Sequence, residues 1–172
     1  IFASRNIIPM RYIFNMLLIS VLLFASCKRE QDTAVVFRVF HNQEWSRFDY
    51  IYGEFDVKDV TTNYEVIMEV KVTENYPSPY ENHQDDSRLL FNLTINNPEG
   101  GNFRSRNFQF NLKDKDGNWK AENKDGYYVF KLPLYEDMTF SDAGVHSFKI
   151  ENKYPKDPLY GIEEITLKCV TK

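Results

Sequence analysis

Residues 64–72 read YEVIMEVKV, and this stretch alternates between two kinds of side chain. Every second position is apolar, and charged residues take most of the positions between. Because successive side chains of a β-strand point to opposite faces of a sheet, the pattern predicts a strand with one face buried and one in water. The apolar face consists of Tyr64, Val66, Met68, Val70 and Val72, and the polar face carries Glu65, Glu69 and Lys71.

The same period of two recurs along the chain on both sides of this stretch. Residues 88–95 (RLLFNLTI) and 106–114 (RNFQFNLKD) alternate just as cleanly. In the second of these, Phe108, Phe110 and Leu112 share one face, and Asn107, Gln109, Asn111 and Lys113 share the other. Further strands are expected at residues 35–40, 48–57, 127–134, 145–152 and 162–170.

Turn-forming residues separate these strands, and no stretch of helical length carries a period of 3.6 residues. The turn signals lie at residues 97–101, 114–118, 124–126 and 141–144. About eight short strands with turns every 8 to 12 residues or so are typical of two packed antiparallel sheets. The sequence therefore predicts an all-β fold, a single antiparallel β-sandwich of immunoglobulin-like or jelly-roll type, over residues 35–172.

The first thirty residues have a different composition, which predicts export. Residues 12–25 (YIFNMLLISVLLFA) carry no charge and follow Arg11. The stretch is shorter than the roughly 20 apolar residues that a bilayer-spanning helix needs, so it has the length of a signal peptide. With Met10 as the natural start, we expect residues 1–9 to be an upstream extension and residues 10–26 to be the signal peptide.

The end of this segment, Phe24-Ala25-Ser26-Cys27, resembles a lipobox, in which small residues precede a cysteine that is acylated and becomes the new N-terminus. Cys27 is therefore the expected lipidation site, and a plain secretory signal with an incidental cysteine is the alternative. Residues 27–34 would form a lipidated polar tether. Within it, Asp32-Thr33-Ala34 resembles the O-glycosylation site of exported proteins in the Bacteroidetes, with Thr33 as the acceptor.

Charge and cysteine content limit the partners of the mature chain. Removal of residues 1–26 leaves 19 Lys and Arg against 25 Asp and Glu, a formal net charge of −6. A nucleic-acid partner would require a basic stripe, so this balance argues against one. Cys169 has no cysteine partner once Cys27 is acylated, and in the last predicted strand it faces the same way as Ile165 and Leu167. A buried, unreactive thiol is expected there.

No motif in the sequence predicts an enzyme or a cofactor site. The three histidines are scattered, and neither a zinc motif nor a G-x-S-x-G motif occurs. Asp114, Asp116 and Asn118 are spaced like the first ligands of a calcium loop, but Trp119 stands where such a loop requires glycine. A hairpin turn is the preferred interpretation. We expect no catalytic residue, no metal and no cofactor, although a glycosidase-like carboxylate pair could form in three dimensions.

The segment of residues 76–82 (YPSPYEN) is the main candidate for a binding surface. Its two prolines stiffen a loop that carries tyrosines, and a rigid aromatic loop loses little entropy on binding. Because proline cannot donate to a sheet, we expect the segment to leave the sheet and run over the surface. Burial is the alternative for the tyrosines, and it is the default expectation for both tryptophans. The candidate partner-binding residues are Tyr76, Tyr80, Asn82, Trp45 and Trp119.

Several features follow one another in a characteristic order. They are the lipobox, Trp45, the strand 64–72, the segment 76–82, the Asp-x-x-Gly-x-Trp hairpin 114–119, the strand after Gly144, and Leu159-Tyr160-Gly161-Ile162. This order resembles the GldH family of gliding-motility-associated lipoproteins of the Bacteroidetes, over nearly the whole mature chain. The resemblance implies an envelope lipoprotein that assists gliding machinery or the secretion system linked to it, with no established enzymatic activity.

Two functional hypotheses follow. The first is a non-enzymatic accessory protein that is anchored to the inner or outer membrane through lipid on Cys27 and docks onto an envelope protein complex, with its domain in the periplasm or at the cell surface. The alternative is a lipid-tethered glycan-binding β-sandwich, in which exposed aromatic rings stack on sugars. Co-purification with membrane proteins would favour the first, and retention on immobilised polysaccharide the second. The sequence leaves the oligomeric state open.

Overall fold

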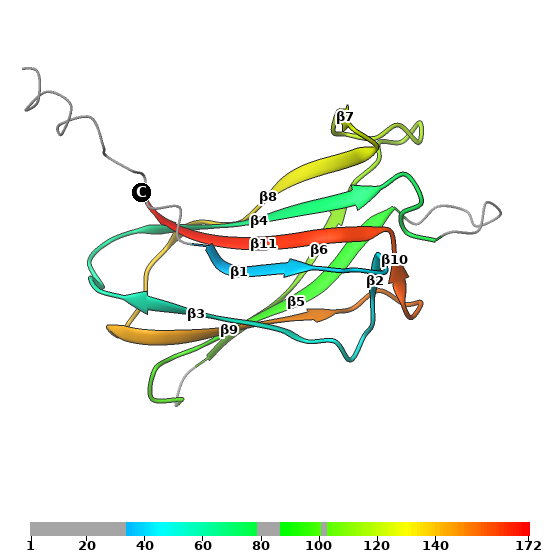
Figure 1. Ribbon diagram of the computed structural model, residues 1–172. Coiled ribbons are helices and arrows are strands. Elements are labelled where there is room, and N and C mark those ends of the chain that lie inside the picture. The colour runs from blue at the N-terminus through cyan, green and yellow to red at the C-terminus, as the bar shows by residue number, and fades with distance from the viewer. Residues whose placement is uncertain (1–33, 79–86, 101–102) are drawn as a thin grey trace, which may run out of the picture. The chain divides into compact units, whose positions relative to one another are not determined.

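The structure is a computed structural model that describes residues 34–78, 87–100 and 103–172 (Figure 1). The described residues form strands and turns, with no helix among them. Accordingly, no apolar helix of membrane-spanning length is found in this part of the chain. Residues 1–33 lie outside it, so the assignments of the upstream extension, the signal peptide, Cys27 and Thr33 stay predictions.

Eight long strands form two antiparallel sheets, and three two-residue strands extend or close them (Figure 1). The long strands are β1 (Ala34–Val39), β3 (Ile51–Val57), β4 (Tyr64–Thr73), β5 (Arg88–Asn96), β6 (Phe103–Asn111), β8 (Tyr127–Met138), β9 (Gly144–Asn152) and β11 (Ile162–Thr171). The short ones are β2 (Glu44–Trp45), β7 (Asn123–Lys124) and β10 (Leu159–Tyr160). The sheet orders are β1-β11-β4-β8-β7 and β3-β9-β5-β6, with β2 and β10 forming a separate pair.

The order of the long strands is that of a jelly roll. They pair in nested fashion: the first with the last, the second with the seventh, the third with the sixth and the fourth with the fifth. Successive long strands therefore alternate between the two sheets, except for the hairpin of β5 and β6. The predicted all-β sandwich is confirmed, and of the two predicted types it is the jelly roll.

The core lies between the two sheets and follows the alternation seen in the sequence. All five side chains of the predicted apolar face of β4, from Tyr64 to Val72, are buried, and the intervening side chains are half-buried on its outer face. The facing sheet supplies Leu89, Phe91, Leu93, Phe148 and Ile150, all buried. Each such side chain contributes roughly 1.5 to 3 kcal/mol through removal of apolar surface from water.

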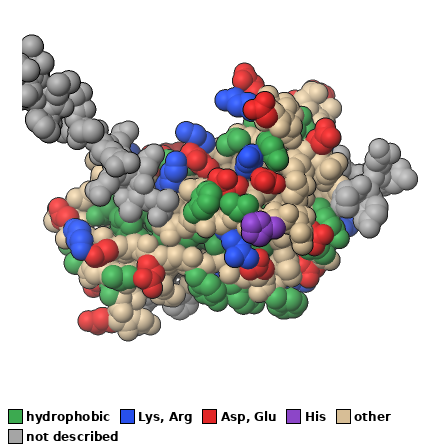
Figure 2. Space-filling model, in the orientation of Figure 1, with side chains coloured by type: hydrophobic (Ala, Val, Ile, Leu, Met, Phe, Trp, Pro, Cys, Tyr) green, Lys and Arg blue, Asp and Glu red, His purple; other side chains and the backbone are tan. Residues whose placement is uncertain are grey.

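The outer face of the five-stranded sheet has mixed charge. Figure 2 shows acidic and basic side chains interleaved on this side of the molecule, with hydrophobic side chains between them. Glu69 lies 3.3 Å from the ammonium of Lys168 and 3.4 Å from that of Lys131, so positive and negative charges neutralise each other locally. Phe37 and Val39 of β1 are exposed on the same face.

Candidate functional site

Trp45, one of the predicted binding residues, is fully buried at the end of the sandwich that β2 and β10 close. Its indole N–H donates to the carbonyl of Asp49 at 2.8 Å, and its own carbonyl accepts from the Asn152 amide at 2.8 Å. The Asn152 side-chain oxygen in turn accepts from the backbone N–H of Tyr154. These contacts satisfy the buried polar groups around Trp45 and join residues 45–49 to residues 152–154. We call this part of the structure the Trp45 corner.

Tyr76 is also buried, and its hydroxyl donates to the carbonyl of Arg88 at 2.9 Å. A side chain at Gly161 would come within 2.7 Å of the Tyr76 backbone, and Gly161 has a φ of 75°, so glycine is required there on two counts. The Leu159-Tyr160-Gly161-Ile162 motif therefore makes room for the tyrosine.

Trp119 is half-buried in the hairpin that follows β6. Its ring stacks on Tyr128 with centroids 4.3 Å apart, and the Lys113 ammonium lies 4.6 Å from the ring centroid. Tyr80 and Asn82 lie outside the described residues. The binding role of these five residues stays a prediction, and the structure adds that the Trp45 and Tyr76 rings belong to the interior.

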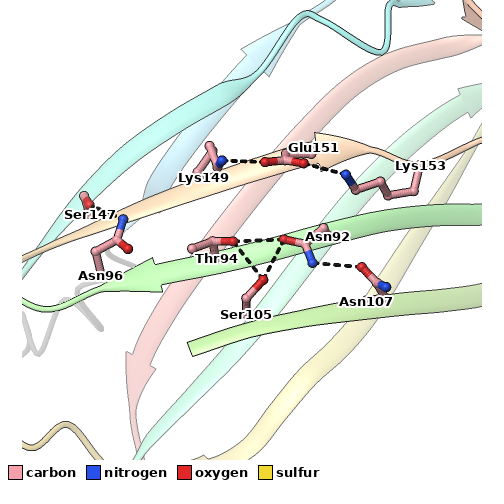
Figure 3. A network of polar contacts seen from close by, with 9 residues as sticks. All are labelled: Asn92, Thr94, Asn96, Ser105, Asn107, Ser147, Lys149, Glu151 and Lys153. Carbon is pink, nitrogen blue, oxygen red and sulfur yellow. Dashed lines mark hydrogen bonds and ion pairs between the residues drawn. The ribbon is translucent and has the colours of Figure 1, made fainter. Parts of the chain in front are cut away.

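A second set of polar contacts lies elsewhere, on the outer face of the four-stranded sheet (Figure 3). Side chains at every second position of β5, β6 and β9 point outward here, because the alternate positions fill the core. The register places Thr94 between Ser105 and Lys149, and Asn92 between Asn107 and Glu151. We call the outward surface of β3, β9, β5 and β6 the polar face.

Hydrogen bonds fix the centre of the polar face. The Asn92 amide nitrogen donates to the Asn107 side-chain oxygen at 2.8 Å. The Asn92 side-chain oxygen accepts from Thr94 at 2.9 Å and from Ser105 at 3.1 Å. Next to them, the Asn96 amide donates to the Ser147 hydroxyl at 3.1 Å. Cross-strand pairs of this kind hold each side chain in one rotamer while leaving hydroxyl lone pairs and amide protons at the surface.

Glu151 organises the charges of the polar face. Its two carboxylate oxygens lie 2.5 Å from the Lys149 ammonium and 2.6 Å from the Lys153 ammonium (Figure 3). The hydrogen bond from Lys149, followed by that from Lys153, lowers the pKa of Glu151, and the bond to Glu151 raises the pKa of Lys149. Glu151 and Lys149 are thus held in their charged forms at neutral pH.

Two tyrosines border the network on the β3 side. Tyr52 lies opposite Lys149 in the register, and the Lys149 ammonium is 5.5 Å from the Tyr50 ring centroid. The rings of Tyr50 and Tyr52 pack edge to face, with centroids 6.5 Å apart, and are 41% and 66% exposed. Exposed aromatic rings beside polar groups are a common feature of binding surfaces.

Two shallow hollows lie along β5 and β6, and one register row, Leu90 with Gln109, separates them. The first, of about 560 Å³, is lined by Asn92, Thr94, Asn96, Ser105, Asn107, Lys149, Glu151 and Lys153. The second, of about 520 Å³, is lined by Ser87, Arg88, Asn111, Lys113, Asp114, Lys115 and Lys120. The hairpin that contributes to the second hollow lies at the end of the sandwich opposite the start of β1 (Figure 1).

Asp114 in the second hollow stabilises its own turn. One of its carboxylate oxygens accepts from the backbone N–H groups of Asp116 and Asn118, each at 2.9 Å. These bonds, that from Asn118 first, lower the pKa of Asp114. The geometry is that of a turn, and nowhere in the described ranges do three or more His, Cys, Asp or Glu side chains group closely enough to hold a metal ion.

The comparison with protein families gives the identity of the domain. The family model described as GldH lipoprotein matches residues 35–169, which span the sandwich from β1 into β11. The chain belongs to the GldH lipoprotein family. The resemblance expected from the sequence is therefore confirmed, and both hollows and the Trp45 corner fall within the GldH-matched residues. No curated protein matches the chain.

Two solved structures resemble this GldH-family chain weakly. One is a family GH115 4-O-methyl-α-glucuronidase with specificity for decorated arabinogalactans, at 16% identity and a TM-score of 0.41, covering 72% of this chain and 14% of that one. The other is the insecticidal delta-endotoxin Cry8Ea1 of Bacillus thuringiensis, at 15% identity and a TM-score of 0.34, covering 75% and 19%. The chain thus spans less than a fifth of either protein, and neither likeness supports a functional argument.

Sequence reasoning did not identify the polar face of this GldH-family domain. One signal was present, because Asn107, Gln109 and Asn111 fall together on the solvent side of a predicted strand. The other members of the network, such as Asn92, Thr94 and Lys149, come from two other strands, and only the pairing register brings the three strands side by side. Tyr50 and Tyr52 gave no separate signal, because alternating tyrosines also occur in ordinary half-buried strands.

Proposed function

We propose that this chain is a membrane-anchored envelope lipoprotein that acts as a non-enzymatic accessory component of the gliding-motility machinery or of the secretion system associated with it. Lipid on Cys27 anchors it, and the sandwich docks onto an envelope protein complex. The observation that carries the proposal is the GldH lipoprotein match, which spans the described β-sandwich almost completely.

The architecture is compatible with this role. A jelly roll of two sheets is rigid and presents both outer sheet faces and the loop ends for contact with other proteins. The candidate site carries hydrogen-bonding and charged side chains that are held by one another, as a docking surface requires. A surface of this kind binds a partner without chemical conversion.

The test is a deletion of the gene in the source bacterium, complemented with the wild-type chain or with Cys27→Ser. Colony spreading on agar and the set of proteins released into the medium are both measured. We expect deletion to impair at least one of them and wild type to restore it. Cys27→Ser should fail to restore it, because without acylation the chain loses its membrane anchor.

Crosslinking in living cells, followed by purification through a C-terminal tag, identifies the docking partner. Recovery of motility or secretion components in the same complex is the expected result. A deletion strain that spreads and secretes like wild type, together with a chain that crosslinks to no envelope protein, would contradict the proposal.

A further inference from the structure

We propose that the polar face and the hairpin of residues 112–120 bind an extended acidic polysaccharide, one whose sugar residues carry carboxylates. This inference goes beyond the accessory role and does not depend on it. It rests on the charge, hydrogen-bonding groups and aromatic rings that four strands and one hairpin bring to a single surface.

The charge of this surface is opposite to that of the chain. The whole sequence has 25 acidic and 21 basic residues, yet the side chains that line the two hollows include six cations and two carboxylates. The cations are Arg88, Lys113, Lys115, Lys120, Lys149 and Lys153. A cationic strip on an acidic protein is complementary to a polyanion.

The two carboxylates that line the hollows already interact with groups of the protein itself. Glu151 accepts from two lysines, and Asp114 accepts from the backbone of its turn. Asp116 in the same turn is not one of the residues that line the hollow. The further acidic side chains, Glu54 and Asp56 of β3, pair in register with Ser147 and Val145, at the end of the face away from the hairpin. Positive charge therefore collects toward the hairpin.

The uncharged groups between the cations suit sugars. A sugar hydroxyl both donates and accepts, and side-chain amides and hydroxyls can meet both roles at one place. The Thr94 and Ser105 hydroxyls lie within hydrogen-bond distance of the Asn92 oxygen and of each other, so each can donate or accept, while the exposed Asn107 amide can donate. Because these side chains are already fixed, binding costs little rotamer entropy.

Tyr50 and Tyr52 supply the apolar contact that a sugar ring also needs. One face of a pyranose presents mainly C–H groups, which pack on an aromatic ring. Both rings are substantially exposed. Tyr52 lies in the register row of Lys149, Thr94 and Ser105, and the Tyr50 ring lies 5.5 Å from the Lys149 ammonium. A sugar seated on Tyr52 could therefore place its carboxylate near the Lys149 ammonium.

The dimensions indicate a polymer rather than a single sugar. Outward positions on a strand repeat about every 7 Å, so the side chains from Asn96 to Arg88 on β5 extend over roughly 27 Å. Only the row of Leu90 and Gln109 separates the two hollows, and no described strand crosses it. A chain of several sugars can thus contact the tyrosine end and the lysine end at the same time.

The first experiment measures retention of the purified, acylated full-length protein, in detergent, on beads carrying polygalacturonate or dextran. We expect retention on polygalacturonate at low salt and about tenfold weaker retention on uncharged dextran. Binding should weaken in high salt, because the contacts between exposed charges are screened. No retention on polygalacturonate, or equal retention on the two polysaccharides, would overturn the inference.

The second experiment places the binding on the polar face. Lys115→Gln with Lys120→Gln should weaken binding about three- to tenfold, and Tyr52→Ala should weaken it about fivefold. The matched control is Lys131→Gln with Lys172→Gln, which removes the same charge from exposed lysines outside both hollows. The control should bind like wild type.

Equal loss of binding in both double variants would show simple ion exchange and overturn the inference. Unchanged denaturant midpoints confirm that the variants fold, and all four substituted lysines and Tyr52 are exposed, so folding should be unaffected. Complementation of the deletion strain by Lys115→Gln with Lys120→Gln is a separate readout. It reports on the accessory role, whereas bead retention reports on the polysaccharide.

Discussion

At the scale of single residues, Cys169 shows how a strand position decides the chemistry of a side chain. It lies on the inner face of β11 with Ile165 and Leu167, as the period of two predicts, and it is buried. Burial raises the pKa of the Cys169 thiol to about 12. The thiolate, which is the reactive form, is therefore almost absent at neutral pH.

We expect Cys169 in the folded protein to resist alkylation by iodoacetamide at neutral pH and to react fully once the chain is unfolded in urea. Because Cys27 is expected to be acylated and so to offer no second thiol, mass spectrometry should count one modification in urea and none without it. Reducing agent should leave the melting temperature unchanged, because no disulfide is expected. Rapid alkylation of the folded protein would contradict the buried position.

Glu151 makes a small part of the stability depend on pH. Its folded-state pKa is lowered by Lys149 and Lys153, so its contribution is present above its ordinary pKa of 4.5 and is lost as the pH falls through the folded value. Wild type should thus lose more unfolding free energy between about pH 6 and about pH 3 than Glu151→Gln, by up to about 1 kcal/mol. Urea unfolding at both pH values measures this, and parallel pH profiles would contradict it.

At the scale of elements, local periodicity predicted most of the strands. Residues 64–72 became β4, and the expected strands at 145–152 and 162–170 match β9 and β11 to within a residue or so at each end. β8 runs on to Met138, past the predicted end at Leu134, because Tyr135, Glu136 and Asp137 interrupt the alternation that a sequence pattern can detect. The two-residue strands β2, β7 and β10 are too short to show any period.

Pairing between strands could not be predicted in the same way. Neighbours such as β1 and β11 lie at opposite ends of the chain, and nothing local specifies which strand lies beside which. The candidate site depends on this strand pairing, since Thr94, Ser105 and Lys149 meet only through the register of three strands. Burial of Trp45 was the default expectation from the sequence, but its hydrogen-bond partners could not be predicted, because Asp49 and Asn152 come from two different segments.

Gly53 is the point at which strands β1 and β3 come closest. A Cβ atom there would lie 2.2 Å from the Val35 carbonyl oxygen and 2.4 Å from a Val36 methyl carbon. Because the first contact is with backbone, Gly53→Ala should force the strands apart and destabilise the fold by roughly 1 to 3 kcal/mol. Chemical denaturation measures the loss. The adjacent Tyr52→Ala, at an exposed position, is the control and should cost much less.

At the scale of the whole molecule, the jelly-roll order makes the last strand indispensable. β11 lies between β1 and β4, so without it β1 would lose its partner strand and β4 would lose one of its two partners. Its inner face buries Ile162, Ile165, Leu167 and Cys169. Three buried aliphatic side chains at roughly 1.5 to 3 kcal/mol each approach the entire stability of a typical domain, about 5 to 15 kcal/mol.

A chain that ends after Gly161 should therefore fail to fold, although it keeps seven of the eight long strands. Its circular dichroism should lack the strand signal, and protease should degrade it at the rate of an unfolded chain. Removal of Thr171 and Lys172 alone, both exposed, is the control and should leave a folded protein with a slightly lower melting temperature. If the chain ending at Gly161 still unfolds cooperatively, the remaining strands suffice for a core and the first and last strands do not close the sandwich together. We expect instead that the whole fold is lost. Without β11, β1 has no other long strand to pair with, and β3, its neighbour across the edge, is already paired with β9.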